Sequence, residues 1–115
     1  MPKQDYYVQG QLTDAAYLVL VSLVTPKHGY LVMSRVEEMT EGSAVIGPAT
    51  LYTTLKKLTQ VNFIRLVQDS DNKKVYCITD KGLETLQVEI DKRERYAMYG
   101  KQAIKKRGSD GNDET

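Results

Sequence analysis

The side chains best suited to specific recognition lie between Pro48 and Gln60, in the sequence PATLYTTLKKLTQ. The leucines of this segment recur at helical spacing on one face, and Thr53, Lys56, Lys57 and Gln60 lie on the opposite face. Such a polar face is costly to bury, but it suits the base edges and phosphates of a nucleic acid. Threonine and glutamine can bond base edges, whereas lysines mostly hold phosphates. The alternative is an ordinary solvated helix face.

Two further groups of residues extend this candidate surface. Thr50 and Tyr52 flank the polar face, and the Tyr52 ring could pack on the core with its hydroxyl free for a phosphate. Lys73 and Lys74 follow the turn-forming sequence DSDN, at the tip of a predicted hairpin. These two lysines favour contacts with a phosphate backbone, or else they only solubilise an edge hairpin.

Four helices and one hairpin are expected to position these residues. Thr13 is a good N-cap for a first, mostly buried helix that a proline ends. A second helix opens near the sequence HGY, and Pro48 takes a favoured first position of the third helix. Asn62 closes the third helix, since asparagine tolerates a left-handed conformation. Short strands are expected at 64–67 and 74–78.

A long fourth helix is expected from Lys81 to about Lys106, capped by Thr79. Its apolar residues fall on two faces, and so small a domain cannot bury both, so one face is expected to meet a partner subunit. That face could also form an effector pocket between subunits, with plain dimer packing as the alternative. The residues expected at this interface are Leu83, Leu86, Ile90, Tyr96, Ala97 and Tyr99.

The distribution of charge is more informative than its total. The 115 residues predict one domain, over residues 1–107, followed by a disordered tail at 108–115 that is rich in glycine, aspartate and asparagine. The net charge is only +1, yet residues 48–107 hold thirteen basic and seven acidic groups. This asymmetry favours a nucleic-acid footprint, although a solvated helix surface would also account for it.

Several other functions are not supported by the sequence. One histidine and one cysteine, far apart, give no metal-ligand spacing, so no metal and no other cofactor is expected. The sequence offers neither a nucleophile paired with a base nor a glycine-rich phosphate loop, so an enzyme is not expected. Membrane-spanning runs and a secretory signal are lacking, and the single Cys77 fits a reducing cytoplasm.

In combination, these motifs resemble the PadR family of bacterial transcriptional regulators, in particular its short members. The similarity runs from Leu12 to about Ile90 and rests on HGY, GPATLYTTLKKL and KKVYCITDKG at their observed spacing. The resemblance implies an α+β, mainly α fold, a winged helix-turn-helix with a two-stranded wing and a C-terminal dimerisation helix at about 80–106. It also implies a repressor that acts as a homodimer on a palindromic operator.

The resemblance further assigns roles to individual positions and shows where the chain departs from the family. The positions that match DNA-contacting positions of the family are Tyr30, Thr50, Tyr52, Thr53, Lys56, Lys57, Lys73 and Lys74. Val75 and Cys77 stand where the family pattern usually has an aromatic and a basic residue, so this wing is less basic. The chain contains no tryptophan, so a ligand sandwiched between indole rings is not supported.

The favoured hypothesis is therefore a cytoplasmic DNA-binding repressor, a homodimer released from double-stranded DNA by a small aromatic or phenolic effector. Two alternatives remain. One is a winged helix that binds a protein instead of DNA. The other is a small-molecule sensor or carrier whose main site lies at the dimer interface.

Overall fold

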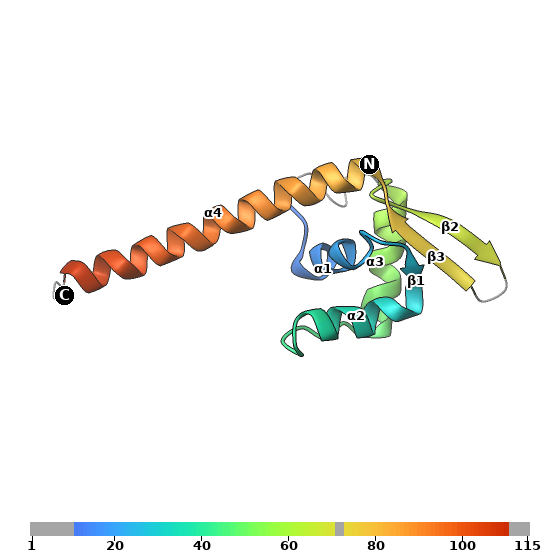
Figure 1. Ribbon diagram of the computed structural model, residues 1–115, viewed down its shortest axis with the longest axis horizontal. Coiled ribbons are helices and arrows are strands. Elements are labelled where there is room, and N and C mark those ends of the chain that lie inside the picture. The colour runs from blue at the N-terminus through green and yellow to red at the C-terminus, as the bar shows by residue number, and fades with distance from the viewer. Residues whose placement is uncertain (1–10, 71–72, 111–115) are drawn as a thin grey trace.

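Three helices pack beside a small sheet, and a long fourth helix projects away from them (Figure 1). The computed structural model describes residues 11–70 and 73–110. In chain order the elements are α1 (Asp14–Ser22), β1 (Lys27–His28), the 3-10 turn η2 (Gly29–Leu31), α2 (Val32–Met39), α3 (Pro48–Gln60), β2 (Ile64–Ser70), β3 (Lys73–Ile78) and α4 (Asp80–Asp110). The predicted mainly helical winged-helix fold is confirmed.

The helix ends follow the local sequence signals. The Thr13 hydroxyl accepts a hydrogen bond from the Ala16 backbone N–H at 3.1 Å, as expected of an N-cap. Thr79 caps α4 in the same way, through the Gly82 N–H at 3.0 Å. Asn62 follows α3 with φ of 65°, in the left-handed region that the sequence predicted for it.

The sheet has one strand more than the sequence predicted. The hairpin of β2 and β3 is antiparallel as expected, and β1 adds to the other edge of β3, giving the order β1-β3-β2. A bulge interrupts β2 between Leu66 and Gln68. Beyond the bulge β2 continues to Ser70, past its predicted end, so Asp69 lies in the strand and not in the turn. The rest of the predicted turn, residues 71–72, lies outside the described residues.

The hydrophobic core lies between α1, α2, α3 and the beginning of α4. Its fully buried aliphatic residues include Val19, Leu20, Leu23, Val32, Val36, Leu51 and Leu58. Leu86 of α4 is only 6% exposed and belongs to this core, and Ile90 packs against it. The expectation that Leu86 would face a partner subunit is therefore corrected: its side chain is used within the chain's own core.

A close backbone contact fixes the beginning of α4. A Cβ atom at Gly82 would lie 2.1 Å from the Phe63 carbonyl oxygen and 2.7 Å from Cγ1 of Ile78, so only glycine allows this approach. The helix then runs to Asp110, past its predicted end near Lys106, and every residue over 94–109 is exposed. Residues 111–115 of the predicted tail lie outside the described part of the chain. Across residues 11–70 and 73–110, no helix is both long and apolar enough to cross a bilayer.

Candidate nucleic-acid interface

Helix α3 presents the polar face that its sequence predicted. Its buried residues are Leu51, Thr54, Leu55 and Leu58. Its predicted contact residues Thr50, Tyr52, Thr53 and Lys56 are all exposed, and Lys57 is half-buried. The Tyr52 side chain is 52% exposed, so this tyrosine is not a core residue. Burial of the leucines thus orients α3 so that hydroxyl and ammonium groups face outwards.

Three of the predicted contact residues come together in one hollow that sequence spacing could not reveal. Tyr30, Tyr52 and Lys74 line a hollow of about 360 Å³ with Gly29 and Tyr76. These residues come from η2, α3 and β3. The hollow therefore lies between α3 and the wing, and its lining combines three tyrosines with a lysine, side chains that can donate hydrogen bonds to an anionic oxygen.

The HGY sequence explains how Tyr30 is held at this hollow. Gly29 is buried, and a Cβ there would lie 3.2 Å from Cε1 of Tyr76, so glycine lets η2 pack tightly on β3. His28 stacks on Tyr30, with ring centroids 5.4 Å apart. His28 is the last residue of β1 and stands at the N-cap position of η2, but its side chain makes no capping hydrogen bond. Its role in the structure is to support the Tyr30 ring.

A second hollow lies on another side of α3. It has a volume of about 340 Å³, and its lining includes Thr50, Thr53 and Lys57 of α3 together with Thr13 and Ala15 of the α1 segment. Sequence reasoning did not connect Thr13 or Ala15 with this surface, because their contact with α3 is long-range. The predicted α3 residues are therefore divided between two hollows, and Lys56 lines neither of them.

The wing supplies two exposed lysines that differ in their surroundings. Lys74 forms an ion pair with Asp69 on the neighbouring strand, with Nζ and Oδ1 3.2 Å apart. Lys73 is exposed and pairs in register with Ser70. Because exposed ion pairs contribute only about 0–1 kcal/mol, a phosphate can replace Asp69 as the partner of Lys74 at little cost.

The predicted interface residues of α4 fall into two groups. Leu86 and Ile90 pack on the core, as described above. Leu83, Tyr96 and Tyr99 are 44%, 61% and 53% exposed, and Ala97 is exposed as well. The Tyr96 and Tyr99 rings lie 6.3 Å apart on the projecting part of the helix. This part of α4 therefore carries apolar surface that the other described residues of the chain leave exposed.

The described residues contain no group of three or more His, Cys, Asp or Glu side chains that could hold a metal ion. Cys77 is a free, half-buried thiol in β3.

Comparison with known proteins adds independent information. The family description "Transcriptional regulator PadR-like family" matches residues 18–88. The transcriptional regulator YqjI of Escherichia coli is 26% identical over 98 residues, which cover 84% of this chain and 44% of that protein. The chain spans less than half the length of the curated relatives it matches.

Solved structures support the same relationship. Bacillus subtilis PadR, solved in complex with operator DNA, matches with a TM-score of 0.58 and 28% identity over 67% of this chain and 46% of that one. The smu.1704 protein of Streptococcus mutans matches with a TM-score of 0.66 and 24% identity over 87% and 93% of the two chains, and shows the shared fold. The family match covers more than half of the sequence and includes α2, α3 and both wing strands, so this chain belongs to the PadR-like family of transcriptional regulators.

Proposed function

We propose that this chain is a sequence-specific DNA-binding repressor that acts in the cytoplasm as a homodimer on a two-fold symmetric site. The observation that carries this proposal is the outward polar face of α3, a helix of thirteen residues whose leucines are buried while Thr50, Tyr52, Thr53 and Lys56 are exposed. A helix presented in this way fits the major groove. The operator DNA bound by Bacillus subtilis PadR supports the same kind of partner.

The surroundings of α3 suggest a division of labour. Thr50 and Thr53 are exposed on α3, and their hydroxyls are proposed to reach base edges, which carry the sequence information. Tyr30, Tyr52 and Lys74 surround a hollow that suits one backbone phosphate, held by hydroxyl groups and an ammonium. One phosphate held between helix and wing would fix the register of α3 in the groove.

The homodimer is proposed from α4. Its projecting part, residues 94–109, is exposed throughout and includes Tyr96, Ala97 and Tyr99. A second copy that covers this surface would bury apolar area that is otherwise in water. Two copies would then place their α3 helices in successive major grooves, roughly 34 Å apart.

Selection from a pool of random duplexes tests this function even though the operator sequence is unknown. The enriched sequence should contain two inverted half-sites about 10 base pairs apart, centre to centre. Fluorescence anisotropy should then show tight binding to this duplex, weak binding to a scrambled one and a steep dependence on salt. Enrichment of a single half-site would argue against the dimer. A failure to bind any duplex even at low salt would favour the winged helix that binds a protein.

A small-molecule effector is the second part of the proposal, and the exposed Tyr96, Met98 and Tyr99 on α4 support it. Tyrosine and methionine side chains suit a flat apolar molecule held between two subunits. Phenolic compounds should lower the affinity for the selected duplex if they bind one arrangement of the dimer better than the other. Binding of such a compound without any change in DNA affinity would favour the sensor or carrier alternative.

A further inference from the structure

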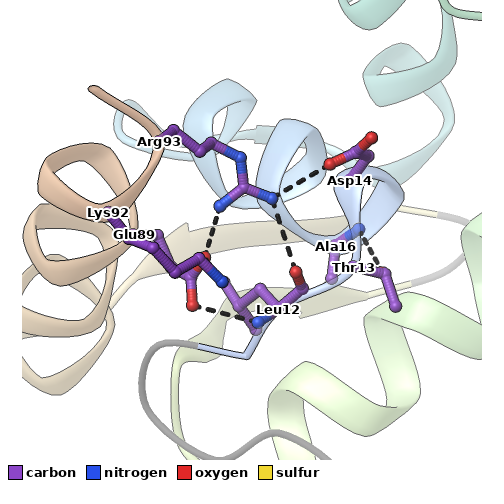
Figure 2. A network of polar contacts seen from close by, with 7 residues as sticks. All are labelled: Leu12, Thr13, Asp14, Ala16, Glu89, Lys92 and Arg93. Carbon is purple, nitrogen blue, oxygen red and sulfur yellow. Dashed lines mark hydrogen bonds and ion pairs between the residues drawn. The ribbon is translucent and has the colours of Figure 1, made fainter. Parts of the chain in front are cut away.

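A polar network ties α4 to the segment that leads into α1 (Figure 2). Glu89 of α4 is fully buried, and its Oε2 accepts a hydrogen bond from the Leu12 backbone N–H at 3.0 Å. Arg93, one turn later, donates to the Glu89 carboxylate, to Oδ1 of Asp14 at 3.1 Å and to the Leu12 carbonyl oxygen at 3.4 Å. The same two residues of α4 thus hold both a side chain and the backbone at the beginning of α1.

The network keeps a charged carboxylate inside the protein. Burial by itself would raise the pKa of Glu89, but the Leu12 N–H, Arg93 and Lys92 outweigh it and hold the pKa below its ordinary value. The Arg93 guanidinium also lies over the Tyr17 ring, 4.0 Å from its centroid. Replacing a buried ion pair by apolar residues often leaves stability unchanged or raises it, so stability alone does not explain this arrangement.

Hydrogen bonds constrain the relative orientation of the groups they join, whereas apolar contacts do not. In α4 the bonds of Glu89 and Arg93 form the second of two attachments to the rest of the fold. The first point is Gly82, whose backbone is packed against the Phe63 carbonyl. Arg93 lies eleven residues further on, about 16 Å along the helix at 1.5 Å per residue. Because α4 is attached at both Gly82 and Arg93, its direction relative to the winged-helix domain is fixed. Beyond Arg93 the side chains of α4 over 94–109 are all exposed, so the described part of the chain leaves this stretch of the helix largely uncovered.

We propose that Glu89 and Arg93 are positioning residues that fix the angle between α4 and the winged-helix domain, and so set the separation of the two α3 helices in the dimer. This inference rests on the proposed function, because it requires two copies joined through α4. A slip of about 1 Å at Arg93 turns α4 by about 4°, given the 16 Å between attachment points. With recognition helices roughly 34 Å apart, such a turn in both subunits changes their separation by about 2 Å, more than half of the 3.4 Å step between base pairs.

The distance between the two recognition helices can be measured directly. A spin label at position 60, introduced as Gln60→Cys in a Cys77→Ser background, reports the separation by pulsed electron spin resonance on the full chain. We expect a single narrow distance. The double substitution Glu89→Met with Arg93→Met should at least double the width of the distribution or shift its mean by about 2 Å or more, because apolar contacts lack direction.

The matched control is Gln87→Met with Asp91→Met. These two residues have the same spacing on the same helix, and their hydrogen bond of 3.3 Å is exposed and lies within α4. The control should keep the distribution of the parent. If the Glu89/Arg93 variant melts as the parent does and also keeps the parent's distribution, the positioning role is refuted.

Two further results keep the inference apart from the proposed function. If the labelled parent gives no distance at all, the homodimer fails, and the inference falls with it. If the double variant does not fold, Asp14→Ala replaces it, because the Asp14 side chain is 93% exposed and its truncation removes one of the hydrogen-bond acceptors of Arg93. This variant should broaden the distribution, and random-duplex selection with it should enrich half-sites at more than one spacing. A parent-like width and spacing with Asp14→Ala would overturn the proposal.

Discussion

Replacing Lys56 by glutamine should reduce the salt dependence of DNA binding by an amount that can be worked out in advance. Lys56 is exposed on α3 and lines neither hollow, and we propose that its ammonium contacts a phosphate. Each phosphate contact contributes about −0.9 to the slope of log K against log salt, and a dimer would lose two such contacts. The slope should become less steep by about 1.8, which at 0.1 M salt corresponds to roughly 60-fold weaker binding.

The assay is fluorescence anisotropy over a salt series, and it needs no operator, because phosphate contacts are independent of sequence. Lys105→Gln is the matched control, since Lys105 is also an exposed lysine of a helix but lies near the end of α4, far from α3 (Figure 1). Its slope should equal that of the parent. Equal slopes for the parent and the Lys56 variant would refute the assignment of the α3 face, and a change in the Lys105 variant would place DNA along α4.

Four further predictions concern stability and are checked by thermal and denaturant unfolding. Gly82→Ala should cost about 3 kcal/mol or prevent folding, because its Cβ would lie 2.1 Å from a backbone oxygen. Thr13→Ala should cost about 1 kcal/mol through loss of the N-cap bond. Gly100→Ala should stabilise the chain by up to about 1 kcal/mol, since its Cβ would meet nothing within 4 Å, and a loss of stability would reveal a partner helix packed there. Because the pKa of Glu89 is lowered, its carboxylate contributes fully to the stability of the fold above its ordinary pKa of 4.5. This contribution is lost as the pH falls through the pKa of Glu89 in the folded state, and the Glu89/Arg93 double variant should lack this acid-dependent part of its stability.

The parts of the fold that the sequence predicted are those governed by neighbouring residues. The caps at Thr13 and Thr79, the proline at the beginning of α3 and the left-handed Asn62 each depend on contacts within a few positions. The same holds for the hairpin of β2 and β3 and for the outward face of α3. Such features can be read from spacing because the chain itself places these groups side by side.

Apart from the bounds of β2 and α4, the features that sequence reasoning missed depend on residues far apart in the chain. Strand β1 has only two residues, and it exists because Lys27 pairs with Tyr76, 49 positions away. The hollow at Tyr30 and Tyr52 likewise needs η2, α3 and β3 to meet. The apolar spacing of α4 predicted that Leu86 would face a partner subunit, but the core of the same chain already buries this side chain. A pattern of apolar residues shows which face is buried, but not by which molecule.

Arg93 is the position where this ambiguity in α4 is resolved. In the sequence, Arg93 and Gly100 interrupt the apolar spacing of this helix and leave the geometry of a dimer open. In the structure Arg93 is half-buried, and it marks the change from residues that pack on the core to residues that are exposed. Its guanidinium satisfies the buried Glu89 carboxylate on one side and reaches the exposed Asp14 on the other, a combination that an apolar residue cannot provide. Arg93 therefore lies where the buried side of α4 ends: Leu86, Glu89 and Ile90 pack inwards before it, and the residues of the proposed contact with a second copy, Tyr96, Ala97 and Tyr99, follow it.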